Sequence, residues 1–435
     1  MKVSKYNHFI PFSADKSIAY NALSNALAII DNENLKAYYQ FTENGVEIKD
    51  KKLIESLLHG SFLCEDNVDE LDIIRYKMLR GRYATNVLTL TIAPTSDCNF
   101  RCTYCYEKKV INGTYMTEAV QDAIINLLES QKSNLQALSV VWYGGEPLLA
   151  LEIIRSLSLR FRKICEDEKI SYSSYMITNG YLLTRKTLET LKELNVSFLQ
   201  VTLDGDSEHH NMRRPLAGGG STFETILRNL KDGYDLLPRI ALRVNVDYDN
   251  ISVAHKINDY LEECGISNKV IPYYGCVRSD NDCYSDNKCL SSCEFAEIEY
   301  NFAMETSRPK DYYPANKTSF CCADRVCGYV IAADGLLYKC WSDIGNIGKS
   351  VGNILESFNN LNEVYLKYML FDPTQIFPCK DCDIMPICMG GCPFQRITNG
   401  KQQCSNYKYI LEHCLIDITR KLQEKQLGIR KSEWD

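Results

Sequence analysis

Strand-like and helix-like patterns of apolar residues alternate through the middle of this chain. From Val87 to about Arg308, apolar and β-branched segments alternate with segments of helical periodicity. Six strands are predicted: NVLTLTIAPT, ALSVVWYGG, YSSYMITNG, VSFLQVTLDG, RIALRVNVDYDN and KVIPYYGC. Helices are predicted to begin near Thr117, Leu148, Thr184, Thr222 and Val253, with a sixth from Glu294 to Ser307. Repeated strand–helix units predict an α/β fold built on a parallel sheet.

The residues before this region follow a different pattern. Two strands, HFIPF and SIAYNALSNALAII, are predicted on either side of the polar turn SADK. Helical periodicity is predicted over Asn34 to Phe41, Lys51 to Leu58 and Val68 to Arg80, with the short stretch Ser61 to Glu65 before the last of them. A hairpin, helices and a small strand are typical of a winged-helix-like module.

A second hairpin is predicted after the alternating region. Asp334-Gly335 is a strong signal for a two-residue hairpin turn. If the residues that flank this turn pair with each other, Tyr329 lies opposite Cys340, with Cys327 within diagonal reach. Both strands then bring thiols to one end of the hairpin.

Composition indicates a globular protein with more than one domain. The chain has 435 residues, of which 45% are hydrophobic and 24% charged, as is usual for soluble globular proteins. The formal net charge of −7 does not indicate a nucleic-acid surface. The sequence shows no apolar run long enough to predict a membrane span, and its start lacks the pattern of a secretory signal. A cytoplasmic location is therefore predicted.

The cysteines are unusually many and unevenly placed. The chain has 20, three of them near residue 100 and nine between Cys321 and Cys404. In a reducing compartment, clustered thiols are better explained as metal ligands than as disulfides.

One cysteine group directly follows the first predicted strand of the alternating region. It reads Cys98-Asn-Phe-Arg-Cys102-Thr-Tyr-Cys105. Three thiolates from one loop can bind three corners of a four-iron cluster, and the missing fourth thiol leaves one iron open to another ligand. A zinc site or a set of buried free thiols is the alternative. In a barrel of strand–helix units, the chemistry belongs at the carboxyl ends of the strands, where this loop lies.

This CxxxCxxC segment resembles the cluster-binding motif of radical S-adenosylmethionine (SAM) enzymes. The resemblance implies a partial (β/α)₆ barrel in which Cys98, Cys102 and Cys105 hold a [4Fe–4S] cluster whose open iron binds the amino and carboxylate groups of SAM. Tyr104, just before the third cysteine, also matches the family.

Residues at the ends of later predicted strands add to this resemblance. Gly144-Gly145-Glu146-Pro147 resembles the GGEP motif of the family, whose glycines allow close approach of a ligand and whose carboxylate can accept hydrogen bonds from the SAM ammonium group. The family's remaining SAM contacts are placed by the resemblance at Asn179, Thr202, Asp204, Arg214 and Asn245. Several of these belong to dipeptides that are also ordinary turns, and a solvated basic turn is the alternative for the segment around Arg214.

A second cysteine block, CKDCDIMPICMGGC, contains Cys379, Cys382, Cys388 and Cys392. Four thiols at this spacing are a strong metal signal, for which zinc ribbons are the alternative to iron. Together with Gly335-x4-Cys340 upstream, the block resembles the SPASM domain, which carries two auxiliary [4Fe–4S] clusters. The resemblance assigns Cys321, Cys327, Cys340 and Cys392 to the first auxiliary cluster, and Cys379, Cys382, Cys388 and Cys404 to the second.

Two of these assignments have alternatives. Cys322 could replace Cys321 or Cys327, or the first auxiliary cluster could keep an open iron. Cys414 competes with Cys404, but it lies inside a helix that is predicted from Tyr407 to Gln426, whereas Cys404 precedes that helix.

Three domains and one function follow from the resemblance. Residues 1–86 are similar to the PqqD-like peptide-recognition domain, residues 87–310 to the radical SAM barrel, and residues 311–435 to the SPASM domain. An oxidoreductase is implied that matures a ribosomally made precursor peptide, in the manner of a sactipeptide or ranthipeptide synthase that forms thioethers, or by joining two side chains. The implied partners are the precursor with its leader, which adds a strand to a sheet edge, and an electron donor such as ferredoxin or flavodoxin. The alternatives are an anaerobic sulfatase-maturating, formylglycine-forming enzyme and a non-catalytic iron–sulfur scaffold that binds peptides.

Overall fold

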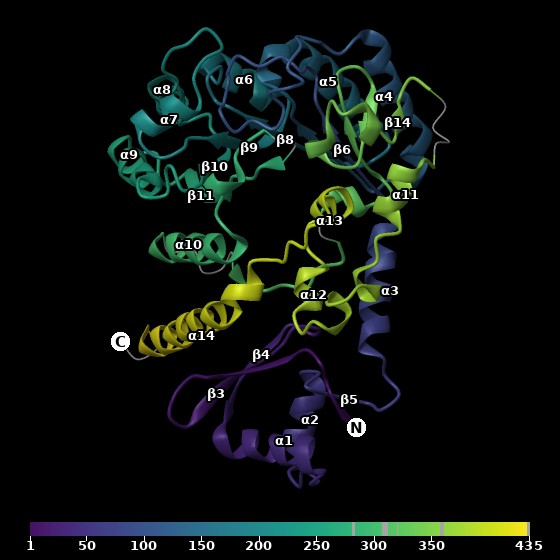
Figure 1. Ribbon diagram of the computed structural model, residues 1–435, viewed down its shortest axis with the longest axis vertical. Helices are drawn as coiled ribbons and strands as arrows, with labels where there is room; N and C mark the ends of the chain where they lie inside the picture. The colour runs from purple at the N-terminus through teal and green to yellow at the C-terminus, as the bar shows by residue number, and fades with distance from the viewer. Residues whose placement is uncertain (281–282, 307–311, 320, 357–360, 433–435) are drawn as a thin grey trace. The chain divides into compact units, whose positions relative to one another are not determined.

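The computed structural model describes residues 1–280, 283–306, 312–319, 321–356 and 361–432, with side chains described as far as residue 424. The chain divides into two compact units (Figure 1). We call Tyr83–Ser291 with Cys322–Leu370 the barrel unit, and Met1–Arg82 with Ser292–Cys321 and Phe371–Asp435 the terminal unit. The predicted boundary at residues 310 and 311 and the predicted helix end at Ser307 fall outside the described residues, and the three-domain division stays a prediction.

The barrel unit contains a nine-stranded sheet in the order β11-β10-β9-β8-β7-β6-β12-β13-β14. Its parallel part consists of β6 (Val87–Ile92), β7 (Ala137–Trp142), β8 (Ser171–Thr178), β9 (Val196–Thr202), β10 (Arg239–Val246) and β11 (Val270–Cys276). These are the six predicted strands, each paired in parallel with the next along the chain. The predicted α/β fold with a parallel sheet is therefore confirmed.

Helices connect these strands (Figure 1). They are α4 (Glu118–Gln131), α5 (Leu151–Asp167), α6 (Arg185–Glu193), α7 (Ser207–Arg213), α8 (Phe223–Asp232) and α9 (Ile257–Glu263). The hydroxyls of Thr117 and Thr184 cap α4 and α6, as their positions predict. Thr222 precedes α8 without capping it through its own side chain, because the carboxamide of Asn211 accepts the hydrogen bonds from the amides of Thr222 and Phe223.

The two faces of the parallel sheet differ in burial. Fully buried residues such as Leu90, Val140 and Leu242 alternate along the strands with half-buried ones such as Val141, Gln200 and Arg243. Because neighbouring side chains on a strand point to opposite faces, the buried set packs under the helices and the half-buried set lines the inner face. This is the arrangement of a partial barrel with a polar interior.

The predicted hairpin forms, but its register differs by one residue. β12 (Gly328–Ile331) pairs with β13 (Leu336–Tyr338), and β13 pairs with β14 (Gly352–Asn353), with α11 (Glu363–Met369) following. Val330 pairs with Tyr338, whereas the predicted register pairs Val330 with Lys339. The prediction of a two-residue turn is wrong because Gly335, at φ 85°, is the last residue of a three-residue loop. β12 also pairs in parallel with β6, so the hairpin extends the barrel sheet.

The terminal unit contains a three-stranded antiparallel sheet in the order β2-β3-β4 and a small β1-β5 pair. Its strands are β1 (Lys2–Val3), β2 (Asn7–Pro11), β3 (Lys16–Asn21), β4 (Ala26–Asp31) and β5 (Leu63–Cys64). Its helices are α1 (Asn32–Asn44), α2 (Lys51–His59), α3 (Glu70–Arg82), α10 (Ser292–Glu305), α12 (Met385–Cys388), α13 (Pro393–Asn399) and α14 (Tyr407–Ser432). In the part of the chain that the structure describes, no helix is long and apolar enough to cross a membrane.

The second strand predicted near the N-terminus is in fact two strands. The carboxamide oxygen of Asn21 accepts hydrogen bonds from the amides of Leu23 and Ser24 at 3.0 and 2.8 Å, and Asn25 adopts a left-handed φ of 61°. Such local bonds compete with the strand ladder. They turn the chain between β3 and β4.

Segments far apart in the sequence share one core in the terminal unit. Tyr6, Ile18 and Tyr20 from the N-terminal strands belong to the same buried apolar cluster as Met385 and Leu415 from the C-terminal region. The N-terminal sheet therefore packs directly against the elements that surround the second cysteine block.

Candidate active site

The loop with the first three cysteines follows β6 at the carboxyl end of the strand. The amide of Thr103 donates to the carbonyl of Arg213 at 2.9 Å, and the amide of Arg101 donates to the carbonyl of Pro215 at 2.9 Å. An isolated β-bridge joins Phe100 to Leu216. The segment that follows α7 therefore holds the cysteine loop in place.

The three thiols of this loop lie within electrostatic reach of one another. Burial is the main factor that raises the pKa of Cys98, to about 12, and Cys102 adds to the rise. Burial also raises the pKa of Cys105, with contributions from Cys102, Glu107 and Cys98. Arg214 opposes the rise in pKa at Cys98 and at Cys102. Three buried thiols gathered in one loop favour a metal centre, because metals bind thiolates.

The glycine turn after β7 packs against the backbone of the cysteine loop. The amide of Gly145 donates to the carbonyl of Thr95 at 3.3 Å, and the amide of Glu146 donates to the carbonyl of Asp97 at 2.8 Å. A Cβ atom at Gly145 would lie 2.2 Å from the Asp97 carbonyl oxygen, and Gly144 has a left-handed φ of 106°. The turn requires glycine because backbone meets backbone here.

Substitution of Gly145 with Ala should therefore displace the cysteine loop. We expect Gly145→Ala to lower iron content and to weaken the predicted binding of SAM by about tenfold or more, a scale of loss expected when a supporting contact of a metal site is disturbed. Iron analysis and a SAM-binding titration measure both effects. Gly218→Ala is the matched control, because a Cβ atom there meets nothing within 4 Å; equal behaviour of the two variants would contradict the assigned role.

The carboxylate of Glu146 joins the ends of β7 and β8. It is buried, and its oxygens accept hydrogen bonds from the Thr178 hydroxyl at 2.7 Å, the Leu148 amide at 3.1 Å and the Asn179 amide at 2.8 Å. Burial raises its pKa, and these donors oppose the rise. A carboxylate can accept about four hydrogen bonds, so Glu146 can still accept one from the SAM ammonium group. That contact stays a prediction.

Four of the predicted SAM contacts meet at one hydroxyl group. The hydroxyl of Tyr104 donates to the carboxylate of Asp204, and it accepts hydrogen bonds from Arg214 at 2.7 Å and from the Asn245 carboxamide at 3.1 Å. The amide of Asn245 also donates to Asp204 at 2.9 Å. These residues come from the cysteine loop and from the ends of β9, α7 and β10, so the site is assembled from four elements.

The two remaining predicted contacts lie at the ends of their strands. Thr202 is the last residue of β9 and is buried. Asn179 follows β8, and its carboxamide donates to Asn99 of the cysteine loop at 2.8 Å. Asn179 therefore links a strand end to the cysteine loop.

The segment around Arg214 is a buried helix end, so the alternative of a solvated basic turn is wrong. Asp206 caps α7 by accepting from the amide of His209 at 3.0 Å. His210 is fully buried, and its ring nitrogen Nδ1 accepts from the Asp204 amide at 3.1 Å. Burial, aided by Arg214, lowers the pKa of His210 to about 3, so this histidine is neutral.

Arg213 is a residue of this site that the sequence did not single out. One of its terminal nitrogens donates to both carboxylate oxygens of Asp247 at 2.7 Å, and its guanidinium carbon lies 4.9 Å from the centre of the Tyr104 ring. Both members of the ion pair are buried. The helix cap at Asp206 is the sequence signal that could have located α7, and with it Arg213.

The profile of the radical SAM superfamily matches residues 92–250, from the end of β6 to just beyond β10. The chain is 24% identical to the radical SAM cyclopropyl synthase TigE of Paramaledivibacter caminithermalis, over 90% of this chain and 89% of TigE. It is 23% identical to the cysteine-type anaerobic sulfatase-maturating enzyme of Clostridium novyi, over 76% of this chain and 96% of that enzyme. The chain belongs to the radical SAM superfamily. The predicted family and the prediction of an enzyme are thereby confirmed.

Solved structures share the fold of this radical SAM enzyme. The structure of anSMEcpe with bound AdoMet and a peptide superimposes with a TM-score of 0.62 and 20% identity, covering 77% of this chain and 99% of the other. Streptococcus suis SuiB bound to its precursor peptide SuiA superimposes with a TM-score of 0.52 and 18% identity, covering 90% of this chain and 95% of SuiB. Both similarities support the partial barrel.

The residues present fit the SAM and the [4Fe–4S] cluster of the superfamily. Three cysteines without a fourth leave one iron open to SAM. Buried polar atoms nearby, the Tyr106 hydroxyl, one oxygen of Glu107 and Nε of Arg214, have no hydrogen-bond partner in the described part of the chain. Burial raises the pKa of Glu107 to about 8. Partnerless buried donors and acceptors beside the thiols are what a polar ligand such as SAM requires.

Three thiols of the second cysteine block, those of Cys379, Cys382 and Cys388, lie near the thiol of Cys404 in the terminal unit. Burial is the main cause that raises the pKa of Cys379 and Cys388, and Cys404 raises both further, with Cys382 acting on Cys379. Arg396 donates to the sulfur of Cys379 at 2.9 Å. Cys414 instead packs in a separate apolar cluster with residues of α10 and α14. Among the described residues, no three His, Cys, Asp or Glu side chains lie close enough together to hold a single metal ion.

The cysteines predicted for the first auxiliary cluster are divided between the two units. Cys327 and Cys340 belong to the barrel unit, whereas Cys321 and Cys392 belong to the terminal unit, so this assignment stays a prediction. The buried ammonium group of Lys339 opposes the rise in pKa that burial causes at both Cys322 and Cys327. Cys322, the alternative ligand, thus shares the surroundings of Cys327.

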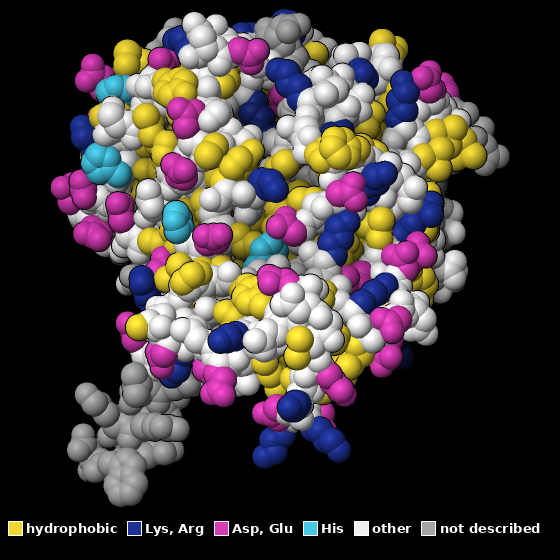
Figure 2. Space-filling model, turned by 60° about the horizontal axis from the view of Figure 1, so that its bottom comes forward, with side chains coloured by type: hydrophobic (Ala, Val, Ile, Leu, Met, Phe, Trp, Pro, Cys, Tyr) yellow, Lys and Arg dark blue, Asp and Glu magenta, His cyan; other side chains and the backbone are white. Residues whose placement is uncertain are grey.

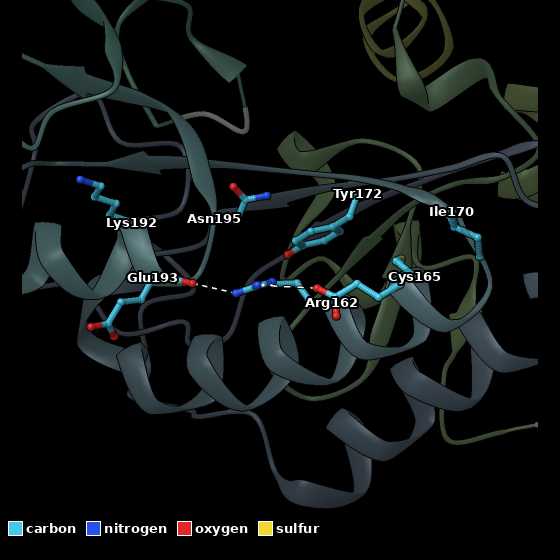
Figure 3. Close-up of a pocket in the computed structure, with 8 residues that line it drawn as sticks. Arg162, Cys165, Ile170, Tyr172, Lys192, Glu193 and Asn195 are labelled. Atoms are coloured by element: carbon cyan, nitrogen blue, oxygen red, sulfur yellow. Dashed lines mark hydrogen bonds and ion pairs between the residues drawn. The ribbon is translucent and has the colours of Figure 1, made fainter.

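A surface pocket of the barrel unit lies at the opposite ends of the strands. It is lined by Arg162, Cys165, Glu166, Ile170, Tyr172, Lys192, Glu193 and Asn195 (Figure 3). Arg162 donates to the carbonyl of Glu193 at 2.8 Å across it. Because these residues surround the amino ends of β8 and β9, the pocket is not part of the site at the carboxyl ends.

Proposed function

We propose that this radical SAM enzyme matures a ribosomally made precursor peptide by forming a thioether or a bond between side chains. The observation that carries the proposal is the similarity to TigE over 90% of the chain, and to SuiB, solved with its precursor peptide, over the same share. The sulfatase-maturating relative covers 76% of the chain. Because the similarity to TigE and SuiB extends over more of this chain than the similarity to the sulfatase-maturating enzyme, a peptide maturase is favoured over sulfatase maturation.

The residues of the barrel unit have distinct proposed tasks. Cys98, Cys102 and Cys105 hold the cluster, which together with bound SAM supplies a 5′-deoxyadenosyl radical that removes a hydrogen atom from the substrate. Glu146 and its glycines fix the cysteine loop, and the Glu146 carboxylate would accept a hydrogen bond from the SAM amino group. Arg214, oriented by Tyr104, is the proposed partner of the SAM carboxylate. The protein contributes orientation and exclusion of water, while the cofactors carry the bond-breaking chemistry.

The second auxiliary cluster is proposed at Cys379, Cys382, Cys388 and Cys404, and the first at Cys321 or Cys322 with Cys327, Cys340 and Cys392. Mutual electrostatic effects among the thiols proposed for the second cluster support that set. The apolar surroundings of Cys414 favour Cys404 as the fourth ligand. Such clusters would accept the electron left on the product or bind a substrate thiolate. A reduced ferredoxin or flavodoxin is the proposed electron donor.

The edge strand β4 is the proposed docking place of the leader. Among the strands that the structure describes, β4 pairs only with β3, and Ala28 and Ile29 are exposed on it. An exposed edge offers unpaired backbone groups to an added peptide strand. Acidic and basic side chains are interspersed over the face of the molecule seen in Figure 2.

A charge at this edge should weaken leader binding. We expect Ile29→Asp to raise KM for the full precursor about tenfold, equivalent to about 1.4 kcal/mol of affinity, with unchanged turnover of a leaderless peptide. Leu159→Asp, which places the same charge at an exposed position on α5, is the control. A point variant is preferable to deletion of residues 1–86, because these residues share the core of the terminal unit. An unaltered KM in Ile29→Asp would contradict docking at β4.

Product analysis tests the function itself. Anaerobically reconstituted enzyme is supplied with SAM, a reductant and the peptide encoded beside its gene, and the product is examined by mass spectrometry. Loss of two hydrogens, with a thiol that no longer alkylates in the case of a thioether, is the expected result. Conversion of a cysteine to formylglycine, independent of any leader, would instead establish sulfatase maturation.

A further inference from the structure

Arg243 lies on the inner face of the barrel sheet. Its neighbours on β10, Leu242 and Val244, are fully buried on the helix-covered face, whereas Arg243 is half-buried. The alternation of strand side chains therefore directs Arg243 to the interior. Gln200 on β9 and Tyr273 on β11 line the same face and bond to each other at 2.7 Å.

The local structure makes room for this guanidinium group and orients it. Nε of Arg243 donates to the carboxamide oxygen of Asn245 at 2.7 Å. The guanidinium carbon lies 5.9 Å from the centre of the Tyr273 ring. A Cβ atom at Gly275 would lie 2.4 Å from that carbon and 2.5 Å from one terminal nitrogen. Glycine at this position of β11 is thus what lets Arg243 extend across the strand.

None of the described residues neutralises the charge of Arg243. Within the described residues, no carboxylate lies within ion-pair distance of it, in contrast to Arg213, which is paired with Asp247. Arg243 also acts across the interior, since it opposes the burial-driven rise in the pKa of Tyr143 beyond the end of β7. A half-buried cation whose Nε is fixed, and whose two terminal nitrogens donate no hydrogen bond to the described residues, is suited to a planar anion.

We propose that Arg243 is a specificity residue that binds a carboxylate of the substrate: an Asp or Glu side chain, or a chain end, beside the reacting residue. The proposal rests on the proposed peptide substrate. The carboxylate of SAM is the other anion that could bind Arg243, but Arg214 is already the proposed partner of that carboxylate. Bidentate binding at Arg243 places the peptide within the barrel and distinguishes acidic from neutral neighbours of the modified residue.

A binding experiment without turnover tests this role. The probes are two capped tripeptides, acetyl-Gly-Glu-Gly-amide and acetyl-Gly-Gln-Gly-amide, titrated into anaerobically reconstituted enzyme with SAM and followed by saturation-transfer NMR. We expect the wild type to prefer the Glu probe by about 10- to 100-fold, the range of a charge-assisted hydrogen bond. Arg243→Gln should lose this preference, and Arg243→Lys should keep only part of it. Arg239→Gln, an exposed position on the same strand, should behave as the wild type.

Measurement of SAM affinity separates the two carboxylate sources. Iron content and the Kd for SAM should stay within twofold of wild type in Arg243→Gln, which also shows that the variant is folded. A tenfold rise in that Kd would overturn the proposal in favour of SAM as the ligand. Equal binding of both probes to the wild type would overturn it as well. Neither outcome depends on the bond that the enzyme forms, so failure here is distinct from failure of the proposed peptide maturation.

Discussion

Replacement of Cys98, Cys102 or Cys105 with Ala will lower reductive cleavage of SAM by at least about 10³-fold, the scale on which loss of one member of a catalytic unit acts. Each variant should also lose about four iron atoms per chain, since one cluster is lost. The reason is that the loop has no fourth cysteine to take over, and a cluster held by two thiolates is not retained. Quantification of 5′-deoxyadenosine and of iron measures the two effects.

Cys264→Ala is the control for this result. Cys264 ends helix α9, outside the cysteine loop and the second block, and its loss should change neither quantity. A Cys102→Ala variant that keeps its iron and still forms 5′-deoxyadenosine would contradict the assignment of the loop.

The second large effect concerns stability. Arg213→Met will leave the buried carboxylate of Asp247 without its cation, because Arg213 donates to both of its oxygens. Removal of one partner of a buried ion pair costs about 3–5 kcal/mol. We expect a decrease of this size in the free energy of unfolding of the apoprotein, measured by urea titration with circular dichroism.

A surface pair provides the matched control. Arg185 and Asp235 lie 2.7 Å apart, with exposed side chains. Arg185→Met should therefore cost less than about 1 kcal/mol. The double variant Arg213→Met with Asp247→Asn should recover part of the loss, since the uncompensated charge is gone. Equal costs for the two single arginine variants would contradict a structural role for the buried pair.

The parallel sheet and the convergence of Tyr104, Asp204, Arg214 and Asn245 could be anticipated from the sequence. Strand period and length located the six strands, and the carboxyl ends of parallel strands meet at one edge. Residues that follow different strands therefore come together even when some 140 positions separate them, as at Tyr104 and Asn245.

Features that depend on polar burial leave little trace in the sequence: the cap at Asp206 could have marked the start of α7, but not which of its side chains are buried. Helix α7 buries His210 and Arg213 and exposes Met212, so it lacks the apolar periodicity that predicts helices. Arg243 has no sequence signal either, because a polar residue on the inner face of a barrel alternates along its strand as a solvent-facing residue does.

Local side-chain and loop geometry explains the remaining differences. The carboxamide of Asn21 ends β3 within a stretch whose apolar content continues beyond it. The hairpin register depends on whether the loop at Gly335 has two or three residues, and a change of one residue shifts every pair. The core that joins Tyr20 to Leu415 reflects contacts between distant segments, for which a single sequence carries no signal.

The most direct test of the account is a measurement on the wild-type protein. The enzyme is purified without oxygen, its iron, sulfide and zinc are quantified, and it is incubated with SAM and dithionite. Bound iron and sulfide, and the formation of 5′-deoxyadenosine with methionine, are the expected result. Zinc in place of iron, or intact SAM after reduction, would contradict it.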